Sequence, residues 1–413
     1  MRRACSKWCS PAASSEFSAV TTSRRAPRAA NVCALALVLV LPATGRAQIA
    51  VSANDNKLVL VNGVPTVAQN PAPDTIAIID LNHRPPALLQ HIEVPTSVVG
   101  PPTSVAITPD ESLALVTAAM RADASDQKRQ VPDRRLSVVD LRARPPAVIA
   151  QLEAGAGAAG VSITRDGRLA LVANRDEGTV SVFRIDGRKV TRIDTVAIGT
   201  ADSGVAHVAI SPDGRSALVS RDGDHAISLL AIDGEKVTYT RRDFGVGLKP
   251  YGIVITPDGG AAVVANLGLG RGDNDTVSLI DLTLKPPRVV DTYTVGPTPE
   301  GIALSPDGKL VAVVTMNGSN RAVDSPFYSP VGRVVLLRVT PGGLRLVAAA
   351  PVGAWPQGAV FSDDGKLLLV QSMIDRAISV FAIEEGPQLR DTGQRIPLKG
   401  GAAAIRTAEK PVR

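Results

Sequence analysis

The chain has 413 residues, a net charge of +6 and a pI of about 9.4, values that by themselves are typical of a nucleic-acid-binding protein. Seven of its 45 bases but only one of its 39 acids lie in residues 1–47, so the remaining chain is formally neutral. Aromatic residues make up only 3% of the sequence. A neutral body with few rings to stack on bases excludes a nucleic-acid partner from the expected functions.

Residues 1–47 resemble a cleaved secretory signal with a long basic region. The apolar run Cys33–Leu41 follows the bases, and Gly45 and Ala47 stand at the positions that favour cleavage before Gln48. The run is too short to span a bilayer, so we expect a periplasmic or secreted bacterial protein without a transmembrane segment. The general and twin-arginine export routes both stay open, as does the true start codon. All three cysteines lie in this leader, which leaves the body without disulfides or thiolate metal ligands.

One phrase recurs along almost the whole body of the chain. Its clearest copy is Ile302–Val314, where a Pro-Asp-Gly turn separates two apolar strands. Variants of the phrase centre on Asp110, Asp166, Asp213, Asp258, Asp307 and Asp364, with a degenerate copy at Asp55. Successive clear copies lie roughly 45 to 57 residues apart, which is the period of a propeller blade.

A third strand with a common pattern follows each turn. It occurs seven times, at Thr75–Asp80, Leu136–Asp140, Thr179–Phe183, Ala226–Leu230, Thr276–Asp281, Arg333–Leu337 and Ala377–Phe381. The sequence ends with Gly400–Ile405, which reads as one more first strand and completes the first blade. We therefore predict an all-β, seven-bladed β-propeller of four-stranded antiparallel blades over residues 48–407, with the ring closed by the C-terminal strand and a tail at 408–413.

The antiparallel order sorts the loops onto two faces. The Pro-Asp-Gly turns lie on one face and the second-to-third strand loops on the other. The second set contains long insertions at residues 118–135, 267–275 and 316–332. Because variable loops on a rigid scaffold usually carry function, we expect the ligand or partner on the face with these insertions.

The strand phrases resemble the YVTN-type β-propeller repeat. Val263–Asn266 and Leu171–Asn174 follow Asp-Gly turns, and Pro250–Gly252 and Pro356–Gly358 precede first strands. The chain is also similar to the wider seven-bladed lactonase group, which includes 6-phosphogluconolactonase-like and carboxymuconate-cyclase-like enzymes. That resemblance implies a His before a first strand, with acidic and Arg residues around the central opening. Val205–Val208 resembles the His phrase, so His207 alone is carried over.

Three polar residues stand at equivalent positions just before the first strands of consecutive blades. Tyr251, Glu300 and Gln357 should therefore lie near the mouth of the central channel, where they could orient a small polar ligand. The alternative is a set of solvated residues around a water-filled channel. Trp355, in the adjoining link, is a further candidate contact, unless it packs under the insertion at 316–332.

Catalysis would need an acid/base pair and a stabiliser for a developing oxyanion. His207 and Glu300 are the candidate pair, and Arg221 and Arg376, at second-to-third loops of the same face, are candidate ligand or oxyanion contacts. The alternatives are a structural histidine and ordinary ion pairing of the two arginines with Asp222, Asp224 or Asp375 nearby. The four histidines show no ligand spacing, so we expect no metal site and no cofactor.

Three interpretations follow from these residues. The first is a non-catalytic propeller that binds a small molecule, a polymer or a protein partner. The second is a lactonase-like carboxylic ester hydrolase acting at the channel mouth through His207 and Glu300. The third is a structural protein of the cell envelope. The first two differ in whether an acid/base pair and an arginine converge at the mouth.

Overall fold

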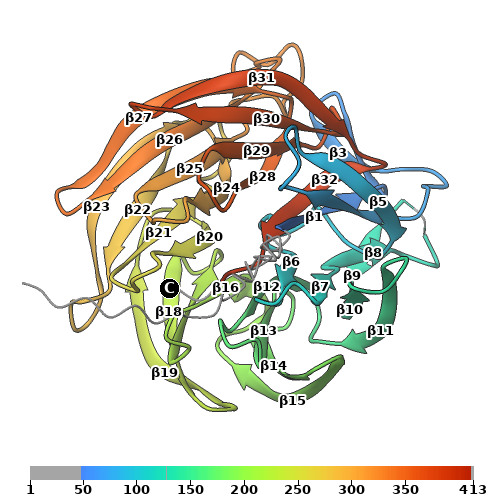
Figure 1. Cartoon of the computed structure of the whole chain (residues 1–413), viewed down its shortest axis with the longest axis vertical. Coiled ribbons are helices and arrows are strands. Elements are labelled where there is room, and N and C mark those ends of the chain that lie inside the picture. Colours follow the sequence, from blue (N-terminus) through green and yellow to red (C-terminus); the bar gives the residue numbers. More distant parts are fainter. Residues whose placement is uncertain (1–47, 127, 411–413) are drawn as a thin grey trace, which may run out of the picture. The chain divides into compact units, whose positions relative to one another are not determined.

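Short runs of aliphatic and β-branched residues form seven four-stranded antiparallel sheets, which surround a central axis as the blades of a propeller (Figure 1). The computed structural model describes residues 48–126 and 128–410. The leader and its cleavage before Gln48 lie outside the described residues, as does the tail beyond Lys410. The predicted all-β, seven-bladed fold is confirmed.

Each blade contributes one strand to the lining of the centre and one to the rim. The innermost strands of blades 1 to 7 are β32 (Gly401–Thr407), β6 (Val105–Ile107), β12 (Ala158–Ile163), β16 (Val205–Ile210), β20 (Pro250–Ile255), β24 (Pro299–Leu304) and β28 (Pro356–Phe361). The second strands are β1 (Ile49–Asp55), β7 (Leu113–Thr117), β13 (Leu169–Asn174), β17 (Ser216–Arg221), β21 (Ala261–Asn266), β25 (Leu310–Thr315) and β29 (Leu367–Ser372).

The third strands coincide with the seven patterns that the sequence shows. They are β4 (Thr75–Asp80), β10 (Arg135–Asp140), β14 (Thr179–Asp186), β18 (Ala226–Asp233), β22 (Asp275–Asp281), β26 (Gly332–Thr340) and β30 (Ala377–Glu384). The outermost strands are β5 (Ala87–Glu93), β11 (Ala147–Glu153), β15 (Lys189–Ala197), β19 (Lys236–Gly245), β23 (Arg288–Gly296), β27 (Gly343–Val352) and β31 (Gln388–Pro397). A single turn of 3-10 helix, Ala201–Ser203, precedes β16.

The two ends of the described chain meet in blade 1. Strand β32 pairs antiparallel with β1, with Ala404 opposite Ala53, so the C-terminal strand closes the ring as predicted. The expectation of a degenerate turn at Asp55 is wrong, because Asp55 is the last residue of the second strand. Blade 1 has no turn between its first and second strands, since these strands come from opposite ends of the sequence.

The six Asp turns share one hydrogen-bond scheme. In blade 5, the Thr256 hydroxyl donates to Asp258 Oδ1 at 2.6 Å, and the Gly260 amide donates to the same oxygen at 3.0 Å. These bonds lower the pKa of the Asp258 carboxyl. Gly259 takes a φ of 74°, a left-handed conformation that glycine adopts without strain. The turns on this side of the propeller are therefore short and alike, and we call this side the turn face.

The opposite face, the loop face, carries the insertions. The segment 118–135 contains the hairpin of β8 (Met120–Ala122) and β9 (Gln130–Pro132), and blade 1 adds a hairpin of β2 (Leu58–Val61) and β3 (Val64–Val67) that the sequence did not reveal. The segment 316–332 of blade 6 reaches this second hairpin, since the Val323 amide donates to Asn62 Oδ1 at 3.3 Å. Loops of non-adjacent blades thus touch on the loop face.

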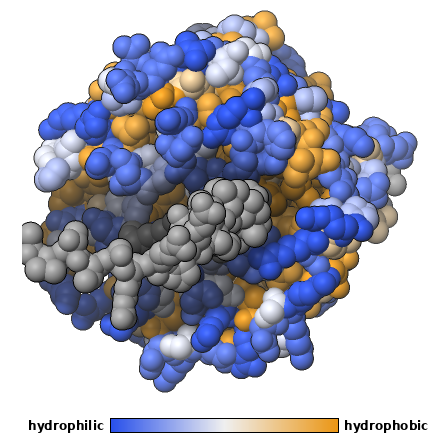
Figure 2. Space-filling model, viewed as in Figure 1, coloured by the Kyte–Doolittle hydropathy of each residue, from blue (hydrophilic) through white to orange (hydrophobic). Residues whose placement is uncertain are grey.

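The hydrophobic core is divided among the interfaces between blades. Phe183 and Phe381 are among the largest fully buried side chains, and each packs in a cluster shared by two neighbouring sheets. Polar residues cover most of the viewed face, with apolar residues visible between them (Figure 2). The residues from 48 to 410 that the structure describes include no helix with the length and apolarity needed to cross a membrane.

Candidate functional site

The predicted ring residues begin the innermost strands of three consecutive blades. Tyr251, Glu300 and Gln357 each follow the proline that opens a strand, and all three are buried within β20, β24 and β28 rather than solvated in links. A glycine follows each of them. A Cβ at Gly301 would lie 1.9 Å from the Gln357 carbonyl oxygen, so glycine lets the adjacent strands approach closely at this end of the channel.

Glu300 and Gln357 interact directly across the boundary between blades 6 and 7. Gln357 Nε2 donates to Glu300 Oε2 at 2.5 Å. Burial raises the pKa of the Glu300 carboxyl to about 8, and the bond from Gln357 offsets only part of that effect. Gln357 Oε1 is also buried, and no hydrogen-bond partner for it exists among the described residues. The pair therefore presents a protonated carboxyl and a free carbonyl oxygen at neutral pH.

Tyr251 interacts electrostatically with groups on several elements around this end of the channel. The smallest of these effects comes from the backbone amide of Gly100, in the connection from blade 1 to blade 2, which lowers the pKa of the Tyr251 phenol. Burial raises the pKa of the Tyr251 phenol, with Arg175 opposing the shift and Glu300 and Asp222 adding to it. Groups from blades 3, 4 and 6 therefore act electrostatically on this phenol of blade 5.

Two residues of this cluster were not assigned to the site from the sequence, where Asp222 appeared only as a possible ion-pair partner of Arg221. Arg175 and Asp222 directly follow β13 and β17, and Arg175 Nη2 pairs with Asp222 Oδ2 at 2.6 Å. Although burial disfavours its charge, Tyr251 and Asp222 raise the pKa of Arg175. Arg175 Nη1 is buried without a partner in the described part of the chain. The only signal in the sequence is their position, which is the first residue after the second strand in consecutive blades.

We call Tyr251, Glu300, Gln357, Arg175 and Asp222 the mouth cluster. It lies at the loop-face end of the innermost strands and combines one ion pair with two unpartnered hydrogen-bonding atoms. Each of these two atoms needs a hydrogen-bond partner, which a ligand or an ordered water can supply. The structure thus brings Glu300 into contact with Gln357 and close enough to Tyr251 to act on its pKa, while ligand binding by these residues stays a prediction.

His207 occupies the glycine position of its blade and is buried in β16. Its Nδ1 accepts the Ile253 amide at 3.1 Å, so the neutral ring must carry its proton on Nε2. Burial, assisted by the nearby charge of Arg406, holds the pKa of His207 well below its usual value. No hydrogen bond joins His207 to Glu300 among the residues described, so their action as a pair stays a prediction.

The two loop arginines lie outside the mouth cluster. Arg221 pairs with Asp224 at 3.3 Å, one of the ion pairs left open as an alternative, and also with Asp243 at 3.0 Å, which was not predicted. Asp222 pairs with Arg175 instead. Arg376 is exposed in the turn before β30, at a φ of 50°, and forms no ion pair within the described ranges.

Trp355 is buried rather than exposed. Only 7% of its surface is accessible, and its backbone amide donates to Ser319 Oγ at 2.8 Å. The indole belongs to an apolar cluster that includes Met316 and Met373. The expectation of an exposed indole is therefore wrong, and the alternative of packing under the segment 316–332 is the arrangement observed. A contact between Trp355 and a ligand stays a prediction.

Metal binding finds no support in the described part of the chain, where no group of three His, Cys, Asp or Glu side chains is placed to hold an ion. The chemistry available at the mouth cluster is hydrogen bonding, charge and proton transfer.

Comparisons with known proteins give the fold a context. No protein-family model matches the chain, and no curated protein matches its sequence. Solved structures do match it. A candidate 6-phosphogluconolactonase of Bacteroides uniformis is 18% identical over 88% of this chain and 99% of its own, with a TM-score of 0.66. A second, from Bacteroides fragilis, is 17% identical over 89% of this chain and 99% of its own, with a TM-score of 0.68.

The periplasmic gluconolactonase of Pseudomonas aeruginosa is a third match. It is 18% identical over 88% of this chain and 100% of its own, with a TM-score of 0.65. The likeness is one of fold. At these identities the shared seven-bladed propeller is shown, and the YVTN-type resemblance stays a prediction from the sequence.

Proposed function

We propose that this chain is a periplasmic or secreted binding protein whose mouth cluster holds a small ligand with both hydroxyl and carbonyl or carboxylate oxygens. One observation carries the proposal. Two buried hydrogen-bonding atoms of the same cluster, Gln357 Oε1 and Arg175 Nη1, have no partner in the described chain. Small-molecule sites typically present a few such convergent polar groups on a preformed scaffold.

The ligand class follows from which groups donate and which accept. Gln357 Oε1 accepts a hydrogen bond, so it selects a hydroxyl group. Arg175 Nη1 donates, and a carboxylate or carbonyl oxygen is its natural partner. Glu300 keeps its proton to about pH 8 and therefore adds a second donor at neutral pH. A hydroxy acid or its lactone satisfies all three groups, in keeping with the gluconolactonase among the proteins of the same fold.

Titration calorimetry with D-gluconate, which has both kinds of oxygen, tests the binding. We expect Gln357→Leu to weaken gluconate binding at least about tenfold, since a buried polar contact to the ligand is lost. Gln394→Leu is the matched control, because Gln394 lies on the outer strand β31 and its side chain bonds only the Pro86 carbonyl. Failure of the wild type to bind gluconate at millimolar concentration, or equal affinity of the Gln357 variant, contradicts the proposal.

Lactone hydrolysis is the second candidate function, and the raised pKa of Glu300 specifically favours it. A carboxylate that ionises at about pH 8 is a competent general base near neutral pH. Glu300 would take a proton from water as the water oxygen bonds to the lactone carbonyl carbon, and Arg175 would stabilise the developing oxyanion. The ring C–O bond then breaks, and the ring oxygen takes the proton held by Glu300, which gives the hydroxy acid and leaves Glu300 ionised again. His207 would contribute only its Nε2–H as a donor.

The pH dependence distinguishes hydrolysis from binding alone. Because the base must be ionised, the enzymatic rate on D-glucono-1,5-lactone should rise with pH through about 8, above the spontaneous rate. Glu300→Gln should abolish this increment, whereas gluconate binding should persist. A rate equal to the spontaneous one from pH 6 to 9 removes the enzyme and leaves the binding proposal standing.

A further inference from the structure

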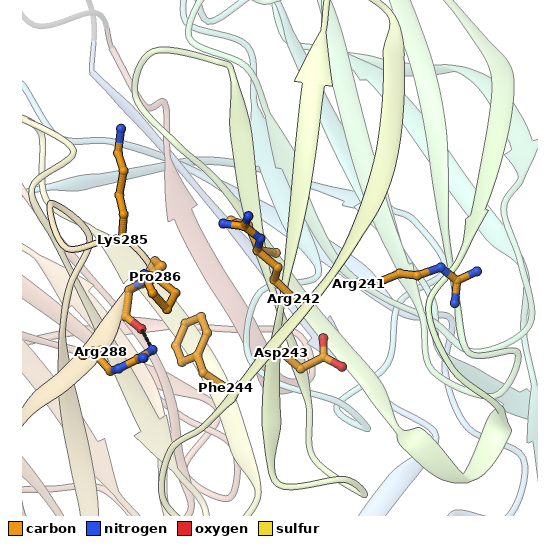
Figure 3. A pocket seen from close by; sticks show the side chains of 9 residues that line it. Arg241, Arg242, Asp243, Phe244, Lys285, Pro286 and Arg288 are labelled. Atoms are coloured by element: carbon orange, nitrogen blue, oxygen red, sulfur yellow. Dashed lines mark hydrogen bonds between the residues drawn. The ribbon is translucent and has the colours of Figure 1, made fainter.

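A concave site lies at the rim, far along the blades from the innermost strands. It is an open pocket of about 640 Å³ between the outer strand β19 of blade 4 and the loop before β23 of blade 5. Figure 3 shows the ring of Phe244 beside Pro286, with Arg242 on the β19 side and Lys285 and Arg288 on the blade 5 side. The lining thus combines apolar side chains with four bases, of which Arg241 points away from Phe244.

The positive charge of these bases is not offset locally. Arg242, Lys285 and Arg288 form no ion pair within residues 48–126 and 128–410, and the side chain of Arg288 bonds only the Pro287 carbonyl, at 3.2 Å. Asp243 is the one acid at the pocket. Its carboxylate is already engaged by Arg221 at 3.0 Å and by the Ser228 and Tyr239 hydroxyls. In a body that is formally neutral, this leaves a local excess of positive charge.

Blade 7 provides an internal comparison for the backbone at this pocket. Strands β19 and β31 bulge at the same place, where Thr240 donates to the Leu229 carbonyl at 2.7 Å and Thr392 to the Val380 carbonyl at 2.6 Å. The next residue is left-handed in both blades. Blade 7 uses Gly393 there, with a φ of 76°, whereas blade 4 holds Arg241 at a φ of 58°. Blade 4 therefore accepts backbone strain that glycine would relieve.

The residue after the bulge differs in a corresponding way. In blade 7, Gln394 Nε2 donates to the Pro86 carbonyl of the neighbouring Pro85–Pro86 loop at 2.7 Å and so joins the two blades. In blade 4, Arg242 faces the equivalent Pro286–Pro287 loop but makes no hydrogen bond to it in the described chain. An amide side chain thus bridges blades 7 and 1 at this position. Between blades 4 and 5 the equivalent position holds an arginine, and a pocket remains there.

We propose that the rim pocket between blades 4 and 5 binds a small aromatic carboxylate. The aromatic body would lie against Phe244 and Pro286, and the carboxylate would pair with Arg242 and the adjacent Lys285 or Arg288. Guanidinium groups bind carboxylates through two parallel hydrogen bonds, and flat apolar surface beside them selects a ring. This site is independent of the mouth cluster and of the function proposed for it.

Calorimetric titration of the purified protein with three probes separates the two parts of the site. 2-Naphthoate has both ring and charge, 2-naphthamide has the ring alone, and inorganic phosphate has charge alone. We expect one naphthoate site, with naphthamide and phosphate at least about tenfold weaker, because each lacks one of the two contacts. No naphthoate binding at millimolar concentration overturns the proposal, and so does naphthamide or phosphate binding as tightly as naphthoate.

Substitutions at the pocket test whether naphthoate binds there. Arg242→Gln installs the residue that blade 7 has at the equivalent position, so the fold should be retained, and naphthoate affinity should fall at least about tenfold. Lys285→Gln should lower it several-fold. Arg144→Gln is the matched control, because Arg144 precedes the corresponding Pro145–Pro146 pair in blade 2. Unchanged naphthoate affinity in both pocket variants, or an equal loss in the Arg144 control, overturns the assignment.

Discussion

Glu300 shows how one buried group can couple the stability of the protein to pH. Its carboxyl group ionises at about pH 8 in the folded protein, against an ordinary pKa of 4.5. Between these two pH values the folded state holds a proton that the unfolded state has released. The unfolded state then binds fewer protons, so the free energy of unfolding must fall as pH rises through this window.

We expect Glu300→Gln to remove this pH dependence, because the amide has the shape of the protonated acid and does not titrate. A shift from 4.5 to about 8 corresponds to a loss of up to about 5 kcal/mol between pH 4.5 and 8. Urea unfolding at several pH values, with the wild type as reference, measures the difference. Parallel stability curves for the two proteins would show that Glu300 is ionised in the folded state at neutral pH.

Contacts between residues at the mouth could be predicted only for residues that occupy the same position in successive repeats. Tyr251, Glu300 and Gln357 share one repeat position, so their approach at one end of the channel follows from aligning the blades. Arg175 and Asp222 belong to loops whose side-chain directions the repeat does not specify. The burial of Trp355 depends on the path of the segment 316–332, which has no periodic pattern. Side chains governed by loops therefore could not be placed from the sequence.

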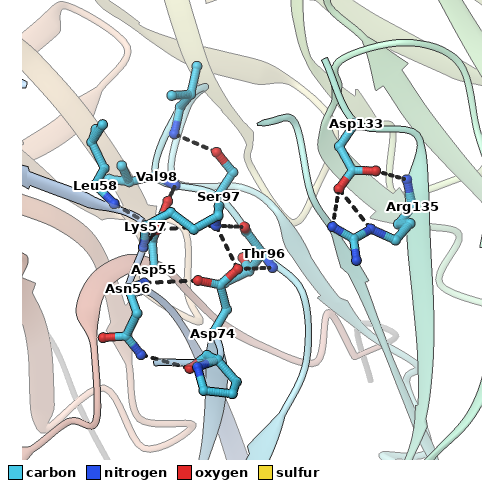
Figure 4. A network of polar contacts seen from close by, with 12 residues as sticks. Asp55, Asn56, Lys57, Leu58, Asp74, Thr96, Ser97, Val98, Asp133 and Arg135 are labelled. Carbon is cyan, nitrogen blue, oxygen red and sulfur yellow. Dashed lines mark hydrogen bonds and ion pairs between the residues drawn. The ribbon is translucent and has the colours of Figure 1, made fainter. Parts of the chain in front are cut away.

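At the scale of elements, a buried ion network connects the insertion of blade 1, residues 56–74, to the neighbouring strand and link. Lys57 Nζ donates to Asp55 Oδ1 at 3.1 Å, to Asp74 Oδ2 at 2.6 Å and to the Thr96 carbonyl at 2.6 Å (Figure 4). The Val98 amide donates to Asp55 Oδ2 at 2.9 Å. Burial raises the pKa of Asp74, and Lys57 opposes the shift. One ammonium group thus ties β1 to the insertion and to the link that enters blade 2.

Lys57→Met should destabilise the protein by about 3–5 kcal/mol, since it leaves two buried carboxylates without their counter-charge. Lys309→Met is the matched control, because Lys309 pairs with Asp307 at 3.7 Å on the exposed turn face. That change should have little effect on stability. Thermal unfolding of both variants checks the difference, and equal melting temperatures would mean that the network contributes no net stability.

The regular strands were predictable and this insertion was not. Alternating β-branched residues bounded by turn signals identified all seven third strands, including Thr75–Asp80. Asp55 was assigned to a degenerate copy of the Asp turn, because it lies where the repeat would place one. For that reason the segment 56–74 was not recognised as an insertion that contains a hairpin. The structure shows that Asp55 instead accepts bonds from Lys57 and Val98. A residue type that suits a turn also suits a buried network, and local sequence alone does not distinguish the two.

For the whole molecule, the number of blades followed from the repeat because each blade buries its faces only against its neighbours. Closure depends on strand β32, whose residues Ala402–Ile405 are almost completely buried. This strand pairs with β1, and it also contributes to the apolar cluster shared with blade 7. The ring is therefore fastened by segments from opposite ends of the sequence.

A chain that ends at Leu398 should lose stability throughout the ring, because β1 becomes an open sheet edge and the interface with blade 7 is exposed. We expect a lower melting temperature together with self-association, measured by calorimetry and light scattering. A chain that ends at Lys410 keeps β32 and serves as the control. A Leu398-terminated protein that melts at the wild-type temperature and stays monomeric would show that the C-terminal strand is dispensable.

The most direct test of the proposed function is a crystal structure of the protein with bound D-gluconate. The ligand should lie at the loop-face mouth, with a hydroxyl group within hydrogen-bond distance of Gln357 Oε1 and its carboxylate on Arg175 Nη1. Density for gluconate only at another surface of the propeller, with the mouth cluster unchanged from its ligand-free arrangement, would contradict the account.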